Sequence, residues 1–325
     1  MPLIVNMKTV MRCVVFQVCD ESRDINDRQC CSSDTMRGRP SGDDADRAQT
    51  TVCGESEQKP AADRMLQPSS TQLETPMPDI DELQRLLRAV TDTAISTLAT
   101  YDDRRAGGER DDQYGLDLLV DGPLVQSLLD HGLGVLSEEA GLIEADRSLI
   151  AVVDPVDGST NASRQIPWFA TSISIMDDDG PLVALVENHV SRERFEAVRG
   201  SGATRNGAPM RAVEAAPSNE HIVLINGVAP AQRPWAQYRV FGASALDISY
   251  VAAGAVDAYI DFDHEAHGVW DYAGALLVCR EVGVPIVDAF GRDLIHRDMA
   301  ERRTPVAAHD QETLETLVEL RKAQA

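Results

Sequence analysis

The spacing of apolar residues divides this 325-residue chain near residue 77. Before that point apolar periodicity is scarce after Cys19, and Asp, Ser, Arg and Gln predominate. A segment of this composition buries too little apolar surface to offset the entropy lost on ordering its backbone. From Met77 onward, apolar residues recur at helical or strand-like spacing. The pattern predicts a disordered extension over residues 1–76 and a folded domain over residues 77–325.

Five stretches of the folded part carry helix signals. The first begins at Asp79, which has Glu82 three residues later in the manner of a capping box, and its apolar residues keep helical spacing to about residue 101. In the second, which ends near residue 129, the pair Gly122-Pro123 places the helix start near Asp121. The other three helices are expected over residues 245–253, 272–282 (followed by Gly283) and 312–323.

Short apolar runs between these helices predict strands. The runs lie at residues 135–136, 149–153, 173–176, 182–186, 222–225, 258–260 and 304–308. Glycines near residue 201 and the pair Asn206-Gly207 predict a hairpin within residues 192–212. Because strands and helices alternate along the chain, we expect a layered α/β or α+β architecture.

The charge balance narrows the possible partners. The chain has 30 Lys and Arg against 53 Asp and Glu, a net charge of -23. A nucleic-acid backbone and an anionic membrane surface both require clustered basic residues. No apolar run approaches the roughly 18 residues of a membrane-spanning helix. We therefore expect neither nucleic acid nor membrane as a partner, and a cytoplasmic protein.

The cysteines also divide the chain. Five of the six lie in the first 53 residues, and only Cys279 lies in the folded part. Their spacings match no zinc motif, and a disulfide framework needs an oxidising compartment, of which the rest of the sequence gives no sign. We favour a disordered extension. An export or redox segment, and a chain that starts at Met65 or Met77, stay open as alternatives.

Three acidic motifs stand at the ends of predicted elements. They are Ser137-Glu138-Glu139-Ala140-Gly141, Asp154-Pro155-Val156-Asp157-Gly158-Ser159-Thr160-Asn161 and Trp270-Asp271-Tyr272-Ala273-Gly274. Each is common on its own as a solvated edge, a turn or a helix cap. Their chemistry becomes informative only if the fold brings them together.

The second motif offers two kinds of ligand on one turn. Asp154 follows an apolar strand and Asp157 comes three residues later, so the two carboxylates can converge. Gly158 and Ser159 can open a helix whose N–H groups bind an anion. Two like charges about 4 Å apart repel by about 4 kcal/mol at an effective dielectric constant of about 20. Protons or metal ions must offset that repulsion, and carboxylates with a carbonyl and water are a magnesium ligand set.

The three motifs, in this order, resemble the signatures of the inositol monophosphatase family. The matching stretches read GVLSEEAG, VVDPVDGSTN with PWFATSISI after it, and VWDYAGALLVCREVG, and RGSGATRNGAP and GASALDISYVAAGAVDAYID match more weakly. The resemblance runs from Pro78 to the C-terminus. It implies a layered α-β-α-β-α sandwich of the inositol monophosphatase/fructose-1,6-bisphosphatase type. It also implies a homodimeric, lithium-sensitive, magnesium-dependent phosphatase that acts on a small-molecule phosphate ester.

The resemblance assigns roles to individual residues. Two or three Mg²⁺ ions would be bound by Glu138, Asp154, the Val156 carbonyl, Asp157 and Asp271. Gly158 and Ser159 would bind phosphate through their N–H groups. As catalytic residues, the Ser159 hydroxyl would orient the attacking water and Asp121 would accept from that hydroxyl. Asp261 and Ser244 would contact the substrate.

The sequence departs from the family pattern at two places. Leu118 stands where a threonine would precede Asp121 by three residues, so Asp117 is the alternative to Asp121. The stretch from Asp261 to Asp271 is longer than the family's, so Asp263 or Glu265 are alternatives to Asp261. For His264 and His267 we favour surface or substrate-contact roles over metal binding.

These inferences lead to one main hypothesis and two alternatives. The main hypothesis is a phosphomonoesterase that hydrolyses inositol 1-phosphate to inositol and phosphate by attack of a metal-activated water. The first alternative is a phosphatase of the same superfamily for histidinol phosphate, fructose-1,6-bisphosphate or a nucleotide 3′-phosphate. The second is an inactive metal-binding regulatory protein, which predicts a lost ligand, and none of the expected ligands is missing from the sequence.

Overall fold

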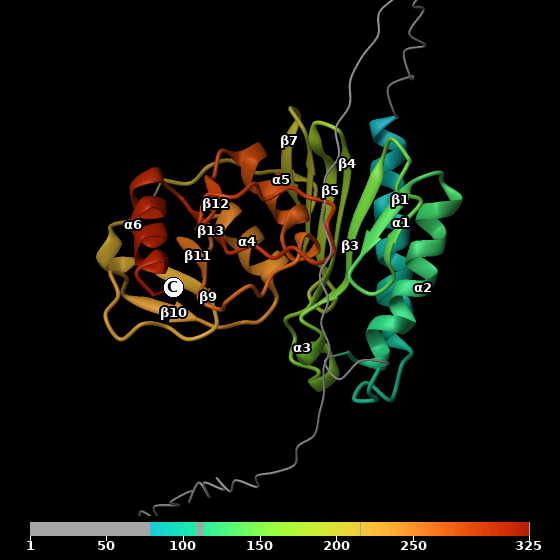
Figure 1. The fold of residues 1–325 in the computed structure, drawn as a ribbon, viewed down its shortest axis with the longest axis horizontal. Helices are drawn as coiled ribbons and strands as arrows, with labels where there is room; N and C mark the ends of the chain where they lie inside the picture. Colours follow the sequence, from blue (N-terminus) through green and yellow to red (C-terminus); the bar gives the residue numbers. More distant parts are fainter. Residues whose placement is uncertain (1–78, 109–112, 215, 325) are drawn as a thin grey trace, which may run out of the picture. The chain divides into compact units, whose positions relative to one another are not determined.

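The computed structural model describes residues 79–108, 113–214 and 216–324. The extension predicted over residues 1–76 lies outside the described residues. Among the described residues, helices and sheets alternate in five layers (Figure 1). This confirms the predicted α-β-α-β-α sandwich.

The helices of these layers follow the chain order. They are α1 (Ile80–Ala99), α2 (Gly115–Asp130), α3 (Ser159–Arg164), α4 (Ser244–Ala252), α5 (Ala273–Val282) and α6 (Gln311–Lys322), with short 3₁₀ turns η1 (Ser218–Glu220) and η2 (Val269–Asp271). In α1, the Asp79 carboxylate accepts a hydrogen bond from the Glu82 N–H at 3.2 Å, which confirms the predicted cap.

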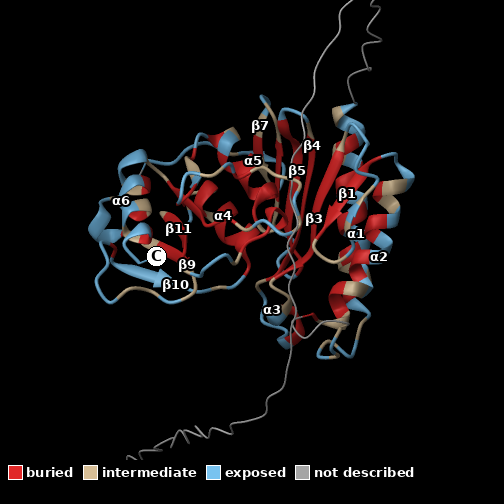
Figure 2. Ribbon diagram, in the orientation of Figure 1, coloured by how far each residue is buried: buried red, intermediate tan, exposed pale blue. Residues whose placement is uncertain are grey.

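The first sheet has eight strands in the order β2-β1-β3-β4-β5-β6-β7-β8. They are β1 (Gly134–Ser137), β2 (Gly141–Ile143), β3 (Ile150–Asp157), β4 (Ala170–Asp177), β5 (Gly180–Asn188), β6 (Arg194–Val198), β7 (Gly202–Arg205) and β8 (Ala208–Pro209). Helices α1 and α2 cover one face, and α4 and α5 cover the other (Figure 1). Every residue of β3 is therefore buried, which explains its continuous apolar run (Figure 2).

The second sheet has five strands in the order β10-β9-β11-β13-β12. They are β9 (Ile222–Asn226), β10 (Gln237–Arg239), β11 (Ala258–Asp261), β12 (Ile286–Asp288) and β13 (Pro305–Ala308). One face of this sheet packs on α4 and α5, and Leu314 and Leu317 of α6 pack on the other. Helix α4 therefore lies between two sheets and contacts both of them.

Helix α2 differs from the sequence prediction. It begins at Gly115, not near Asp121, and Pro123 lies inside it. The Tyr114 N–H donates to the Asp117 carboxylate at 3.1 Å, so the first turn is stabilised by a side chain of the helix itself. A proline tolerated in the interior was thus mistaken for the first helical position. The shift places Asp117 in the first turn and Asp121 one turn further on.

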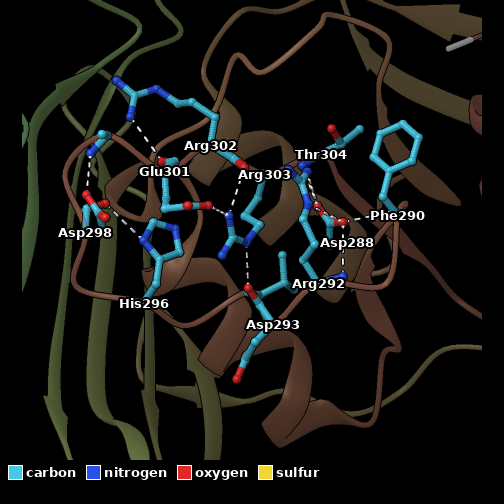
Figure 3. Close-up of polar contacts among 12 residues, drawn as sticks. Asp288, Phe290, Arg292, Asp293, His296, Asp298, Glu301, Arg302, Arg303 and Thr304 are labelled. Atoms are coloured by element: carbon cyan, nitrogen blue, oxygen red, sulfur yellow. Dashed lines mark hydrogen bonds and ion pairs between the residues drawn. The ribbon is translucent and has the colours of Figure 1, made fainter. Parts of the chain in front are cut away.

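Two arginines, the half-buried Arg292 and the buried Arg303, fix the irregular segment between β12 and β13 (Figure 3). The Arg292 guanidinium donates to both oxygens of Asp288, at 3.1 and 2.8 Å. Arg303 is 7% exposed, and it donates to the main-chain carbonyls of Asp293 at 2.7 Å and Arg302 at 3.0 Å. These bonds satisfy carbonyls that no strand partner reaches. None of the helices in the described ranges is both long and apolar enough to cross a membrane.

Candidate metal and phosphate site

Three carboxylates converge where β3 ends and α5 begins. Asp154, Asp157 and Asp271 each offer an oxygen, and these oxygens all lie within 4.8 Å of one another. Asp154 and Asp157 belong to β3, and Asp271 ends the η2 turn that precedes α5. The fold thus brings together two of the three motifs found in the sequence.

A break in the strand register lets the two β3 carboxylates share one side. Side chains three residues apart on a regular strand point to opposite faces. The pairing of β3 with β4 shifts register between Asp154 and Asp157. The Val156 N–H then donates to the Asp154 carboxylate at 3.0 Å, as in a turn. This irregularity re-aims Asp157 toward Asp154.

Asp157 is held by the N-terminus of α4. Main-chain N–H groups of Ser244 and Ala245 donate to its two oxygens at 2.9 and 2.8 Å. Burial, and next the charge of Asp271, raise the pKa of Asp157 to about 7, and these hydrogen bonds oppose the rise. Helix α4 therefore stabilises a carboxylate that its surroundings would otherwise protonate.

Glu138 belongs to the same group of charges. It follows β1, and its N–H donates to the Val153 carbonyl at 3.1 Å. Burial, and next the charge of Asp271, raise its pKa to about 9. Burial and the charge of Glu138 raise the pKa of Asp154 well above its usual range. The carboxylates cannot all be ionised at neutral pH unless a cation offsets their repulsion, and an all-oxygen donor set of this kind suits Mg²⁺.

A glycine and a short helix follow these ligands. Gly158 has φ of +87°, and a Cβ there would lie 3.0 Å from the Gly242 carbonyl oxygen and 3.1 Å from the Trp168 carbonyl oxygen. No other residue fits that close approach without displacing the backbone before α4. Helix α3 begins at Ser159, as the sequence predicted, and the Ser159 hydroxyl donates to the Val156 carbonyl at 2.9 Å.

The structure does not form the hydrogen bond expected between Ser159 and Asp121. Asp121 is buried and accepts a hydrogen bond from the Ser137 hydroxyl. Burial raises its pKa to about 6, against the effect of the Ser137 hydrogen bond. Asp117, the alternative named from the sequence, is also buried, and its charge contributes to the raised pKa values of both Glu138 and Asp154. The charge of Asp117 therefore acts on the acidic group from the first turn of α2, which begins earlier than predicted.

The predicted substrate residues lie beside Asp271 but below the surface. Asp261 is fully buried, and one of its oxygens accepts hydrogen bonds from the Asn226 amide at 3.0 Å and the Asp263 N–H at 2.9 Å. Its other oxygen lies 3.9 Å from His267 Nε2. Ser244 is buried, with its hydroxyl 3.4 Å from both His267 ring nitrogens. Because the Asp261 side chain is fully buried, other residues cover it and a substrate could contact it only after they move.

The two histidines of this region separate clearly. His264 is exposed, whereas His267 is buried, with Nδ1 3.7 Å from Asp271 and Nε2 2.8 Å from the Tyr259 hydroxyl. Burial opposes protonation of His267, but its contact with Asp271 and the charges of Asp271 and Asp261 raise its pKa to about 9. Asp263 and Glu265, the alternatives to Asp261, are exposed.

Comparison with known proteins decides which family contains this arrangement. The model of the inositol monophosphatase family matches residues 82–324, nearly all of the described part. The chain belongs to this family. Its inositol monophosphatase-like region therefore coincides with the five layers and contains all three acidic motifs.

Relatives within the family carry different names. Fructose-1,6-bisphosphatase of Pyrococcus furiosus is 28% identical over 209 residues, which cover 63% of this chain and 82% of the relative. The Methanocaldococcus jannaschii relative, named fructose-1,6-bisphosphatase/inositol-1-monophosphatase, is 28% identical over 58% of this chain and 76% of its own length. Nus factor SuhB of Escherichia coli is 33% identical over 48% of this chain and 63% of its own length.

Solved structures of the family share the fold. A Pyrococcus horikoshii protein with similarities to inositol-1 monophosphatase superposes with a TM-score of 0.67 at 24% identity, covering 74% of this chain and 98% of that one. The Thermotoga maritima inositol monophosphatase gives a TM-score of 0.64 at 20% identity, covering 75% and 98%. The layered architecture is therefore that of inositol monophosphatase-type proteins.

The structural roles of two polar residues of this inositol monophosphatase family member were not predicted from the sequence. The Asn161 amide donates to the Trp168 carbonyl at 2.8 Å and the Phe241 carbonyl at 2.7 Å, so it joins α3 to the segment before α4. Asp247 of α4 is buried and accepts a hydrogen bond from the Trp168 indole at 2.8 Å. Asn161 lies inside the second motif, which was the available signal. Asp247 lies in an otherwise apolar helix and gave no signal of its partner.

Proposed function

We propose that this protein is a magnesium-dependent phosphomonoesterase that hydrolyses a small polyol phosphate, with inositol 1-phosphate as the first substrate. The observation that carries the proposal is the convergence of Asp154, Asp157 and Asp271 within 4.8 Å at the start of α3. Buried carboxylates at this spacing are costly unless cations bind among them. Phosphate esters need the same cations, because their negative charge repels a nucleophile.

The proposed ligands follow from the sequence and the geometry together. Glu138, Asp154 and the Val156 carbonyl would hold one Mg²⁺ ion, and Asp154, Asp157 and Asp271 would hold a second. A third, weaker ion would lie near Glu138. When bound, these ions supply positive charge against the phosphate and increase the acidity of a coordinated water.

The residues of the chain have their own tasks in the proposed reaction. The main-chain N–H groups of Gly158 and Ser159 would bind the phosphate oxygens at the start of α3. The Ser159 hydroxyl would orient the attacking water, and Asp117, whose charge acts on Glu138 and Asp154, would take the role first considered for Asp121. The N-terminus of α4 favours the ionised form of Asp157 and holds its carboxylate in place through the N–H groups of Ser244 and Ala245.

Other substrates of the superfamily are the second candidate. Fructose-1,6-bisphosphate is favoured among them because a relative at 28% identity is named fructose-1,6-bisphosphatase and one at 29% is named fructose-1,6-bisphosphatase/inositol-1-monophosphatase. Histidinol phosphate and a nucleotide 3′-phosphate complete the set. The similarity to a relative named Nus factor SuhB supports a regulatory role as a further alternative, which corresponds to the inactive metal-binding protein considered from the sequence. The presence of every proposed ligand argues against loss of activity.

The deciding experiment measures phosphate release from inositol 1-phosphate, fructose-1,6-bisphosphate, histidinol phosphate and a 3′,5′-bisphosphonucleotide. Each substrate is tested with magnesium and with a chelator, and lithium is added to the active reactions. The variant Asp154→Asn should abolish turnover, whereas Asp146→Asn, at an exposed position, should leave it unchanged. Absence of magnesium-dependent release from folded protein would contradict the proposal. Sedimentation of the same samples tests the proposed homodimer.

A further inference from the structure

The segment between β11 and Asp271 is held by the C-terminal helix. We call residues 261–267 the substrate link, because it joins Asp261 to the η2 turn. Arg321, in the last turn of α6, donates through Nε to the Asp261 carbonyl and through Nη2 to the Asp263 carbonyl, both at 2.8 Å. Arg321 is 2% exposed. One buried guanidinium thus joins two carbonyls that are two residues apart.

We propose that Arg321 is a positioning residue for substrate binding, which sets the course of the substrate link over the acidic site; this inference rests on the proposed phosphatase function. Arg321 contacts neither the carboxylate group nor the phosphate-binding turn in this arrangement. It acts through the main chain of Asp261 and Asp263. The substrate class it governs is the phosphate ester of a polyol, whose hydroxyls the link would face.

The geometry explains why an arginine is needed. Without Arg321, the Asp261 carbonyl would lose a buried hydrogen bond and the Asp263 carbonyl a part-buried one, and the link would move to regain a partner for the buried Asp261 carbonyl. A planar guanidinium presents its N–H donors in a fixed fork, so it can satisfy both carbonyls at once. A lysine offers a single ammonium group, which can reach one carbonyl well but not impose the same spacing on two.

The link itself carries strain that its surroundings must hold. Glu265 has φ of +51°, a conformation that costs a non-glycine residue free energy. The link is also anchored before and after this point. The Phe262 N–H donates to the Asn226 carbonyl at 2.9 Å, and the Arg303 N–H donates to the His267 carbonyl at 2.8 Å. The Arg321 bonds to Asp261 and Asp263 hold the main chain of the link, and a side-chain substitution can remove them.

The chain provides a matched control in Arg303. Like Arg321, it is buried and its side chain donates to two main-chain carbonyls, those of Asp293 and Arg302 (Figure 3). Those carbonyls belong to the segment between β12 and β13, not to the substrate link. Its main-chain bond to His267 is kept when the side chain is replaced. Substitution of Arg303 therefore reproduces the loss of a buried arginine without releasing Asp261 and Asp263.

The experiment compares Arg321→Ala, Arg321→Lys and Arg303→Ala with the full-length wild type. We measure KM and kcat for inositol 1-phosphate, magnesium affinity by calorimetry, Tm, and hydrogen exchange of peptides that cover residues 261–267. For Arg321→Ala we expect KM to rise about tenfold, because small displacements of positioning groups cost that much or more. Magnesium affinity should stay at the wild-type value, and exchange should quicken in the link alone. For Arg321→Lys we expect a KM and a rate of exchange in the link between those of wild type and Arg321→Ala.

Arg303→Ala should lower Tm as much as Arg321→Ala while KM and exchange of the link stay at wild-type values. Equal KM for Arg321→Ala and wild type, or an equal KM rise in Arg303→Ala, overturns the proposal. Failure of the wild type to release phosphate from any substrate defeats the proposed function instead. In that case hydrogen exchange alone decides whether Arg321 positions the link, and unchanged exchange in Arg321→Ala rejects it.

Discussion

The main-chain N–H of Ser244 donates to the carboxylate of Asp157 at 2.9 Å, although the two residues are 87 positions apart in the sequence. Asp157 ends a strand of the first sheet, and Ser244 begins the helix that lies between the two sheets. The proposed metal site therefore depends on how α4 docks against β3. Several expected outcomes depend on this docking and on the charges beside it.

Replacement of Gly158 should disturb both the fold and the activity. In Gly158→Ala the new Cβ would lie 3.0 Å from the Gly242 carbonyl oxygen and 3.1 Å from the Ala243 Cβ, at a positive φ. We expect a loss of about 1–3 kcal/mol in the free energy of unfolding and a larger fall in kcat, because α4 would shift from Asp157. Urea denaturation and phosphate release measure the two effects.

The control for this variant is Gly291→Ala. Gly291 also has a positive φ, of +76°, but nothing lies within 4 Å of a Cβ at that position. This variant should lose stability from backbone strain alone and keep its kcat. Equal kcat in the two variants would show that the close approach to Gly242 has no bearing on the site.

Replacement of Asp154 should abolish turnover and stabilise the metal-free protein. Burial and the charge of Glu138 raise the pKa of Asp154, so its ionised form opposes folding when no cation is bound. In chelator at pH 8, Asp154→Asn should therefore unfold at a higher temperature than wild type, and magnesium should raise its Tm less. A metal-free Asp154→Asn that is less stable than wild type would contradict this account.

Removal of magnesium should cost more stability as the pH rises. The pKa of Glu138 is raised from 4.5 to about 9, so between these values the folded metal-free protein retains a proton that the unfolded chain has released. Stability of the metal-free protein therefore falls as pH increases through this window. Bound cations replace the proton, so the difference in Tm between magnesium and chelator should be larger at pH 8 than at pH 5.5. A difference in Tm between magnesium and chelator that becomes smaller as the pH rises would contradict this prediction.

Acid should destabilise the protein through His189. This histidine is buried, its Nε2 lies 2.7 Å from the Thr171 hydroxyl, and burial lowers its pKa to about 3. In the unfolded chain His189 is protonated below about pH 6.5, whereas in the folded protein it is protonated only below about pH 3. The stabilisation is therefore complete above pH 6.5 and is lost as pH falls through this window, by about 1.4 kcal/mol per pH unit at most.

Urea denaturation at pH 7.5 and pH 5 measures this contribution. His189→Gln removes the titrating group while keeping a hydrogen-bonding side chain near Thr171, so its stability should depend less on pH than that of wild type. As a control, His264→Gln changes an exposed histidine and should leave the pH dependence unaltered. Parallel pH curves for wild type and His189→Gln would rule out this residue as the cause.

The sequence predicted those parts of the fold whose signals are local. Asp79 caps α1, and Gly283 ends α5 with φ of +81°, because caps and glycine conformations are decided within a few residues. The start of α2 was wrong because the Asp117 side chain stabilises an earlier first turn, and Pro123 is accommodated in the helix. Strands β2, β10 and β12 were missed, since three residues carry too little periodicity for detection.

The sequence also predicted those parts of the candidate site that are contained in short local motifs. The motifs named Glu138, Asp154, Asp157 and Asp271, and the structure brings the last three within ligand distance of one another. The burial of Asp261 could not be foreseen, because the residues that contact it, Asn226 and Arg321, lie 35 and 60 positions away along the chain. Tertiary contacts of that separation leave no trace in local spacing.

The register shift between Asp154 and Asp157 has a consequence for the order in which the molecule is assembled. The strand can supply both carboxylates early, but Ser244 and Asp271 leave the ribosome much later, because they lie 87 and 114 positions after Asp157. A nascent chain that ends before Asp271 would have two crowded carboxylates and no complete cation site. At the proposed metal site, the full set of carboxylates would therefore exist only after Asp271 has been synthesised and packed against β3, so metal binding would report folding beyond that residue.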